Sequence, residues 1–593
     1  MKIFSFELAA AARVATALLV FGLAGCGGDD GTDTATGPND NSTPVRSTEF
    51  GQVEGVVSAD GKTLAWLGVP FAKPPVGTLR WQPTQPPDAW TGVRPAKEYA
   101  DPCTQIGGLY GPAPKGKDYS AVWETFFKPI GSEDCLYLNI WSPTQPTTDE
   151  AQLPVIVYIH GGSNVVGSAI DAVYVGDNLA NSANAVIVTV AYRLGLFGWF
   201  AHPAFNTGDP IRDSGNFALL DMIQSLKFVK NNISNFGGDP DNVTIMGQSA
   251  GATNVNSLIV SPLAAGLFHK AVAISGAIGG SSMTSAVNKS NAIINTLLIK
   301  DHLATDKDSA DAFRTAQSDE WIRNYLMAKS NTDLYTIQVD PTGGKWGTGS
   351  LTLQPGSATA QVWGTVAPIS DGTVMPANSM AAIKAGNFNK VPQMVGNTSE
   401  EGKLFSTAFK VDNFTRVKWM NGTFLGTATG LQLEDLVDDT IISPLTPENY
   451  DTYAYNNANH VTPAPSITTA AFLSFTNSSN TAYYGQVPLY AYSFNWNKEP
   501  APWDVVYGAW HSGDLPFFFG NFGMNLYAFG WSDANQAGRL ALADAMQKSL
   551  AAFIRSGDPN NGSLGVTWDP WTPTEQHKLQ FDASLTQAMI SEN

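Results

Sequence analysis

Residues 243–251 read VTIMGQSAG, and this stretch decides the fold class. Its first four residues form a short apolar and β-branched run, which is typical of a buried strand. The next five have the Gly-x-Ser-x-Gly spacing in which a serine occupies a strained turn at the end of a strand. The residues that follow have a spacing compatible with a helix. Strand, sharp turn and helix in this order predict that Ser249 exposes its hydroxyl to a substrate.

Two upstream runs, PVIVYIHGG at 154–162 and AVIVTVAYRLG at 185–195, also have the composition of buried strands. Between these runs and Ser249, residues 216–235 carry apolar side chains largely at helical spacing, and FGGDPDN at 236–242 predicts a turn. This alternation predicts an α/β fold, with a mostly parallel central sheet covered by helices on both faces.

The bulk composition is that of a globular protein. The chain has 593 residues, of which 43% are hydrophobic and 11% aromatic. After residue 276 the pattern becomes irregular, and we interpret polar stretches such as 330–357 and 413–429 as long insertions. The formal net charge of −18 would repel a phosphate backbone, so nucleic acid is an unlikely partner.

The first 25 residues have the pattern of a signal peptide: basic Lys2 and Arg13, then an apolar stretch too short to span a bilayer. Leu23-Ala24-Gly25-Cys26 resembles the lipobox of bacterial lipoproteins, in which the cysteine is lipidated. We therefore predict a lipid anchor at Cys26, a flexible polar tether over 26–48 and a folded domain over 49–593. The expected location is the bacterial cell envelope, at its periplasmic or cell-surface face, or the medium if Cys26 is not lipidated.

The remaining cysteines are Cys103 and Cys135. Export to an oxidising compartment favours a disulfide between them, and two separate buried thiols are the alternative.

A serine hydroxyl needs a histidine to take its proton and a carboxylate to orient that histidine. His511, in GAWHSGDLPFFFGN, is flanked by glycines and followed by an apolar run, as expected of a loop that reaches an active site. His269 is expected at a helix end, and three further downstream histidines are expected to be surface or structural residues: His302, His460 and His577.

The acid and the oxyanion donors are less well defined by pattern. VPQMVGNTSEEGKLF, at 391–405, predicts a strand followed by a loop with Glu400 and Glu401, and the residues alone do not decide between these two acids. His160, Gly161 and Gly162 end an earlier strand, where small residues allow backbone N–H groups to approach a developing negative charge. A tight turn that only needs flexible glycines is the alternative there.

The ordered motifs resemble the type-B carboxylesterases, the family that includes cholinesterases and bacterial para-nitrobenzyl esterases. The resemblance runs from about residue 52 to residue 521. Besides HGG and the Ser249 segment, the matching motifs are GVPFAKPPVGTLRW, SEDCLYLNIWSP, AYRLGLFG, SEEG and GAWHSGDLPFFFG.

The resemblance implies an α/β-hydrolase fold and hydrolysis of small-molecule carboxylic esters, without a cofactor or a metal. It implies Ser249 as nucleophile, Glu401 as acid and His511 as base. It also supports the disulfide and implies a supporting role for Ser275 through hydrogen bonding. The implied oxyanion donors are Gly162, Ser163 and Ala250, with Gly161 supporting them.

Three departures from the family pattern bear on the substrate. Ser163 stands where many members have a third glycine, and its hydroxyl narrows the expected gorge. Gln248 replaces a glutamate that often precedes the nucleophile, and Thr125 stands where cholinesterases have a choline-binding tryptophan, with Trp123 two places away. These departures shift the expected substrates from choline esters towards neutral esters.

Two alternatives stay open at this point. A lipase or sterol esterase could use the same triad, with the apolar segment 517–519 lining a long acyl pocket. A binding protein without catalysis is the other alternative, although all three triad positions are filled. The oligomeric state is left open.

Overall fold

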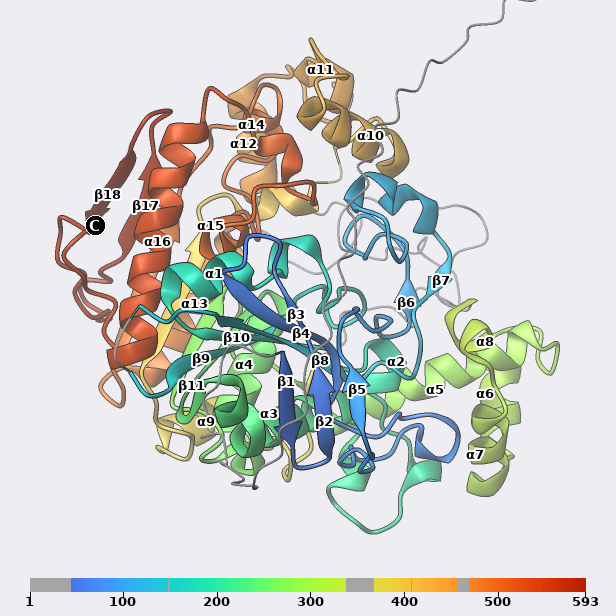
Figure 1. The fold of residues 1–593 in the computed structure, drawn as a ribbon. Helices are drawn as coiled ribbons and strands as arrows, with labels where there is room; N and C mark the ends of the chain where they lie inside the picture. Colours follow the sequence, from blue (N-terminus) through green and yellow to red (C-terminus); the bar gives the residue numbers. More distant parts are fainter. Residues whose placement is uncertain (1–43, 148–149, 337–366, 407, 457–468, 593) are drawn as a thin grey trace, which may run out of the picture. The chain divides into compact units, whose positions relative to one another are not determined.

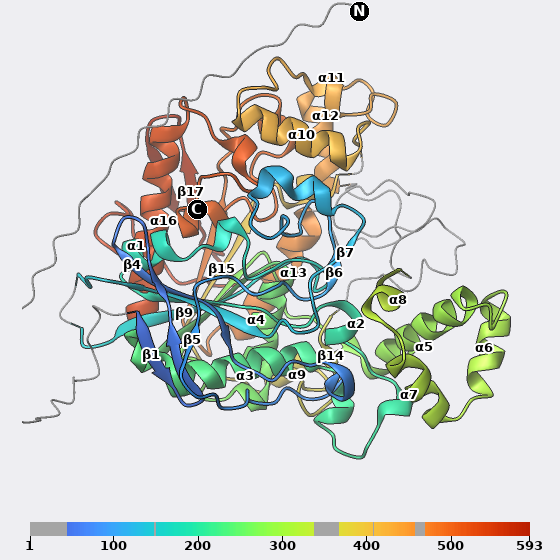
Figure 2. The same ribbon diagram turned by 45° about the vertical axis from the view of Figure 1, so that its right-hand side comes forward.

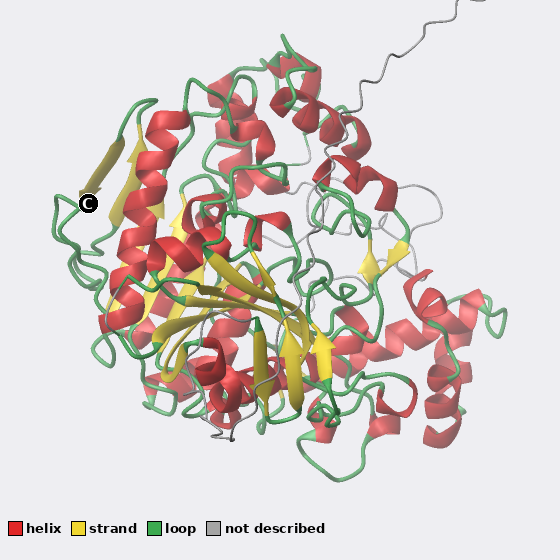
Figure 3. Cartoon of the chain, in the orientation of Figure 1, coloured by secondary structure: helices red, strands yellow, loops and turns green. Residues whose placement is uncertain are grey.

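The computed structural model describes residues 44–147, 150–336, 367–406, 408–456 and 469–592. Its centre is an eleven-stranded sheet, with helices on both sides (Figures 1 and 3). In spatial order the strands are β18 (Ala588–Glu592), β17 (Leu579–Ala583), β16 (Leu489–Phe494), β15 (Gln393–Thr398), β12 (Lys270–Ile274), β11 (Gly238–Gln248), β9 (Leu153–Ile159), β10 (Val186–Val190), β8 (Tyr137–Pro143), β4 (Thr63–Pro70) and β3 (Val56–Val57).

Seven neighbouring strands of this sheet run parallel to one another; in spatial order they are β17, β16, β15, β12, β11, β9 and β10. The strands at both edges, β18 on one side and β8, β4 and β3 on the other, pair antiparallel. Every residue of β9, β10 and β12 is buried. Strands of this kind need cover on both faces, which explains their continuous apolar composition. The predicted mostly parallel sheet is confirmed.

Alternate residues of β9 belong to two separate cores. Ile156 and Tyr158 pack on the face covered by α1 (Asp177–Ala183) and α16 (Gln536–Ser556). Val155 and Val157 pack on the opposite face. That face is covered by α3 (Phe217–Asn232), α4 (Ala250–Val260), α9 (Ser379–Lys384) and α13 (Thr469–Tyr483), and Figure 2 shows α3 and α9 on the side of the sheet away from α1.

The remaining helices belong mostly to insertions. A group at one side of the sheet in both Figures 1 and 2 consists of α5 (Met283–Lys300), α6 (Lys307–Thr315), α7 (Asp319–Met327) and α8 (Asn331–Thr336). The others are α2 (Gly195–Gly198), α10 (Asn413–Phe424), α11 (Leu433–Leu436), α12 (Pro447–Asn456), α14 (Trp503–Val506) and α15 (Leu515–Phe519). Smaller sheets pair β1 (Val45–Thr48), β2 (Gly51–Glu54) and β5 (Val93–Pro95), β6 (Gln105–Ile106) with β7 (Pro129–Ile130), and β13 (Ser281–Ser282) with β14 (Ile369–Ser370).

The structure corrects two expectations about irregular segments. Most of the polar stretch 413–429 is helix α10, because Asp412 caps its first turn and Val417 and Met420 bury one face. The expected turn at 236–242 lies largely within β11, which pairs with β9 at Gly238, shifts register, and pairs again from Val243. Both segments carry polar side chains on their exposed faces, so their composition alone did not indicate a helix or a strand.

The N-terminal predictions fall mostly on residues that the structure does not describe. Residues 1–43, which include Cys26, are in this group. The end of the predicted tether forms β1, which pairs antiparallel with β2, so the folded part begins before residue 49. Among the described residues, no helix has the length and apolarity needed to cross a membrane.

Candidate active site

Ser249 sits between β11 and α4 with the backbone angles φ 57° and ψ −125°. This conformation is uncommon for a residue with a side chain, and it is typical of a turn that projects a serine from the end of a strand. The residues two positions before and after Ser249 must be small: a Cβ on Gly247 would lie 2.5 Å from the carbonyl oxygen of Gly251, and a Cβ on Gly251 would lie 2.1 Å from that of Ile159. The predicted series of strand, turn and helix is confirmed.

Glu401 lies just after β15, and its side chain is completely buried. One carboxylate oxygen, Oε2, is hydrogen-bonded to Nδ1 of His511. The other accepts hydrogen bonds from the backbone N–H of Thr398 at 3.0 Å and the amide of Asn397 at 3.2 Å. The carboxylate is therefore fixed in position and held next to the imidazole ring.

The neighbouring acid points elsewhere. Glu400 accepts a hydrogen bond from the N–H of Ala509 at 2.7 Å and forms an ion pair with Lys403 at 2.5 Å. Of the two acids that the residues alone left open, Glu401 is therefore the one that contacts His511.

His511 is held on several sides. The rings of Phe405 and Phe472 lie 5.1 and 4.9 Å from the imidazole, between ring centres. Nε2, the nitrogen that does not contact Glu401, lies 3.1 Å from the amide nitrogen of Gln248. Among the described residues, the hydroxyl of Ser249 has no hydrogen-bond partner, although Ser249 and His511 line the same cavity.

The other histidines lie outside this arrangement. His269 directly precedes β12 instead of ending a helix, because α4 ends at Val260 and a short connection follows. His302 is exposed, His577 pairs with Glu575 at 2.9 Å, and His460 falls outside the described residues. His160 is buried, and burial lowers the pKa of its ring to about 4, so it packs as a neutral side chain.

The glycine turn after β9 faces Ser249. Gly162 has φ 102°, and a Cβ there would lie 2.1 Å from the carbonyl oxygen of Val166. A Cβ on Gly161 would come within 3.1 Å of the Ser249 Cβ. The backbone N–H groups of Gly162, Ser163 and Ala250 donate to no acceptor among the described residues, so they are available to an oxyanion.

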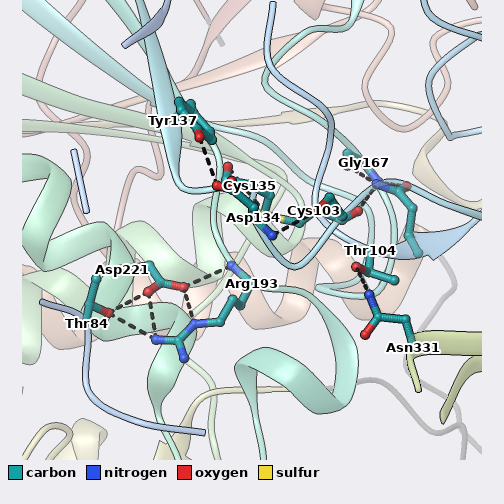
Figure 4. The surroundings of a disulfide bond; sticks show 12 residues. Thr84, Cys103, Thr104, Asp134, Cys135, Tyr137, Gly167, Arg193, Asp221 and Asn331 are labelled. Atoms are coloured by element: carbon teal, nitrogen blue, oxygen red, sulfur yellow. Dashed lines mark hydrogen bonds and ion pairs between the residues drawn. A yellow bond between two sulfur atoms is a disulfide. The ribbon is translucent and has the colours of Figure 1, made fainter. Parts of the chain in front are cut away.

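A disulfide joins Cys103 to Cys135, which makes the alternative of two separate thiols wrong (Figure 4). Gln105, two residues beyond the first cysteine, is fully buried. Its amide donates to the carbonyl of Gly167 at 2.7 Å, and its oxygen accepts from the N–H of Gly167 at 2.9 Å. The disulfide loop therefore supports the turn that carries Gly162 and Ser163.

These observations can be compared with known proteins. A family model described as the Carboxylesterase family matches residues 42–592. The chain belongs to the carboxylesterase family. It is therefore a carboxylic ester hydrolase.

Two relatives illustrate the breadth of this carboxylesterase family. The chain is 30% identical to cocaine esterase of Homo sapiens over 573 residues, which cover 93% of this chain and 90% of the relative. It is 28% identical to para-nitrobenzyl esterase of Bacillus subtilis over 544 residues, covering 91% and 95% of the two chains.

Solved esterases share the fold of this carboxylesterase. A PNB esterase superimposes with a TM-score of 0.64 at 25% identity, covering 92% of this chain and 97% of the other. A carboxylesterase of Geobacillus stearothermophilus gives 0.64 at 27% identity, covering 93% and 98%. The predicted α/β-hydrolase fold is confirmed.

Several residues of this carboxylesterase have surroundings that differ from those expected from the sequence. Ser275 directly follows β12, but its hydroxyl is buried and has no hydrogen-bond partner among the described residues, so the expected hydrogen bond is not formed. The aromatic segment 517–519 forms the last part of α15, and its side chains pack in the core rather than in the cavity. Trp123 is 38% exposed and packs edge-on against Phe414, outside the cavity lining.

A buried polar group that the sequence reasoning missed lies near the Glu401 and His511 pair. Asp514 is fully buried, and Tyr492 donates its hydroxyl to Oδ2 at 2.7 Å. Burial raises the pKa of Asp514 to about 7, and the negative charge of Glu401 adds to this effect. The local pattern gave no sign of this, since HSGDLP shows only an acid three residues after the histidine.

A second group missed by the sequence reasoning is a buried ion pair. Arg193 Nη2 lies 2.8 Å from Asp221 Oδ1, and the backbone N–H of Arg193 donates to Oδ2 at 3.0 Å (Figure 4). Both side chains are at most 3% exposed. The pair ties the segment after β10 to the first turns of α3.

Proposed function

We propose that this carboxylesterase hydrolyses its substrates through an acyl-enzyme intermediate on a triad of Ser249, His511 and Glu401. The observation that carries the proposal is the imidazole of His511, bonded at Nδ1 to a completely buried carboxylate while Nε2 faces the segment that carries Ser249. A bond of this kind fixes the tautomer in which Nε2 can accept a proton.

In the first step Ser249 Oγ attacks the ester carbonyl carbon, and its proton passes to His511 Nε2. The amide of Gln248 must release Nε2 for this transfer. The carbonyl oxygen becomes an oxyanion, which accepts hydrogen bonds from the backbone N–H groups of Gly162, Ser163 and Ala250. The bond to the alcohol oxygen then breaks, and that oxygen takes the proton from His511.

In the second step water attacks the acyl-enzyme carbonyl carbon, and His511 takes one of the water's protons. The bond between the acyl group and Ser249 Oγ breaks, and Oγ recovers the proton. The carboxylate of Glu401 stabilises the imidazolium in both steps. The products are the alcohol and the carboxylic acid.

We propose carboxylic esters as substrates whose part next to Ser249, at the reacting end of the cavity, is neutral. Gln248 brings no negative charge next to Ser249, and the cavity is lined largely by glycine, aliphatic and aromatic residues. The segment 517–519 packs in the core, which removes one argument for a long lipase-like pocket.

The triad is tested with Ser249→Ala. We expect it to abolish hydrolysis of para-nitrophenyl acetate and labelling by a fluorophosphonate probe, whereas Ser163→Ala, which keeps the backbone donor, retains both. Substantial turnover by purified Ser249→Ala would rule out Ser249 as the nucleophile.

We also propose that the protein is exported and anchored at the bacterial cell envelope through lipid on Cys26. The support is the sequence pattern alone, since Cys26 lies outside the described residues. Stable anchoring by lipid needs more than one acyl chain, and the modified cysteine of a lipoprotein carries two or three. In cell fractionation, Cys26→Ser is expected to move the protein from the membrane to the soluble fraction, and unchanged membrane association would contradict the anchor.

A further inference from the structure

One residue of the active-site cavity carries a charge that the proposed chemistry does not use. Among the described residues that line this cavity, Asp171 is the only one with a carboxylate, an ammonium or a guanidinium group. It shares the lining with Ser249 and His511, and part of its surface remains accessible.

The contacts of Asp171 satisfy only one of its oxygens. Oδ1 accepts a hydrogen bond from the N–H of Val173 at 3.0 Å and so caps the 3-10 turn Ala172–Tyr174. Among the described residues, Oδ2 accepts no hydrogen bond and no basic side chain pairs with the carboxylate. A desolvated carboxylate with an unused oxygen is costly unless a donor reaches it.

The surroundings of Asp171 are aromatic. Tyr174 and Tyr527 line the cavity with it. Burial raises the pKa of both phenols, and the charge of Asp171 contributes to that rise, as it does for Tyr119 and Tyr158 behind them. Burial also raises the pKa of Asp171 itself to about 6, so the group remains mainly ionised at neutral pH.

We propose that Asp171 is a specificity-determining residue that accepts a hydrogen bond from a donor on the substrate, so that esters bearing a hydroxyl or a protonated amine are preferred. This inference rests on the proposed function, because it places the donor in the cavity of Ser249. A substrate without a donor would displace water from Oδ2 and leave this oxygen without a hydrogen bond. The free energy lost in this way discriminates strongly between substrates with and without the donor.

Two substitutions separate the acceptor from the charge. Asp171→Asn keeps an oxygen that can accept from Val173 or from a substrate but removes the charge. Asp171→Leu removes both. A purely structural capping role would change the activity on all esters alike, whereas a recognition role changes the preference between esters.

The substrates are two matched series, so that either side of the ester can carry the donor. One consists of para-nitrophenyl hexanoate, 6-hydroxyhexanoate and 6-aminohexanoate. The other consists of the monoacetates of hexanol, 1,6-hexanediol and 6-aminohexanol. Hydrolysis of this second series is measured by the release of acid. We expect the wild-type protein, in at least one series, to favour the donor-bearing esters about ten- to hundredfold in kcat/KM.

In that series Asp171→Asn is expected to lose most of the preference for the amine and to retain part of that for the hydroxyl, and Asp171→Leu to lose both. The apparent Tm of each variant, measured by thermal unfolding, serves as the control for folding. Equal kcat/KM ratios in the wild-type protein and both variants, in both series, overturn the inference. Ser249→Ala distinguishes this failure from failure of the proposed function, because only the latter leaves hydrolysis of every ester intact in that variant.

Discussion

The amide nitrogen of Gln248 lies 3.1 Å from Nε2 of His511, on the edge of the ring opposite the contact with Glu401. In the tautomer with its proton on Nδ1, facing the carboxylate, Nε2 is the acceptor and the amide is the donor. Gln248 therefore lies at the nitrogen that receives the proton of Ser249 in the proposed mechanism.

Replacing Gln248 by glutamate is expected to move the acid limb of the kcat/KM profile to higher pH by about one unit or more, because a carboxylate beside Nε2 stabilises the protonated ring. The measurement is kcat/KM for para-nitrophenyl acetate from pH 5 to pH 9. An acid limb at the wild-type position would show that residue 248 does not act on His511.

Gly162→Ala is expected to lower kcat about 100- to 1,000-fold, since its Cβ would lie 2.1 Å from the carbonyl oxygen of Val166 and the donor turn must move. Gly108→Ala provides the matched control. That glycine lines the same cavity, but a Cβ there meets nothing within 4 Å. Comparable kcat values for the two variants would contradict the assignment of the oxyanion donors.

Removal of the disulfide by the double substitution Cys103→Ser and Cys135→Ser is expected to destabilise the protein by about 3–4 kcal/mol, from the entropy of the loop it closes. The apparent Tm should fall, and kcat should fall with it because Gln105 holds Gly167 from this loop. Thermal unfolding with and without reductant checks this. Reductant should lower the Tm of the wild-type protein but not that of the double variant. An equal effect of reductant on the two proteins would argue against stabilisation by the disulfide.

Asp514 is expected to make stability depend on pH. Its pKa is raised from 3.8 to about 7 by burial, so the folded state holds a proton that the unfolded state releases above pH 4. The contribution of protonated Asp514 to the free energy of unfolding is fully present below pH 4 and is lost as the pH rises through 7. Tyr492, Glu401 and His511 are the polar groups next to Asp514.

Asp514→Asn keeps the acceptor for Tyr492 and cannot ionise. We expect this variant to be more stable than the wild-type protein at pH 8, by up to roughly 4 kcal/mol, with the difference shrinking towards pH 4. Thermal unfolding of both proteins at pH 4.5, 6 and 8 measures the trend. A difference that does not change with pH would mean that Asp514 does not titrate in this range.

Local pattern was enough for much of the site. The serine turn, the glycine turn after β9 and the loop of His511 each need particular residues at adjacent positions, because glycine alone tolerates the close backbone approaches found there. Helix α10 was missed, because its apolar residues are few and its polar residues resemble those of a loop.

By itself the sequence determined the alternation of strands and helix around Ser249, the serine turn and the family resemblance, since these depend on residues close together in the chain. The tertiary structure decided which acid meets His511, that Gln248 occupies Nε2, that Gln105 supports the donor turn and that Asp171 stands as the lone charge in the cavity lining that the structure describes. Each of these depends on the distance between segments that the sheet brings together, or on how completely a side chain is removed from water.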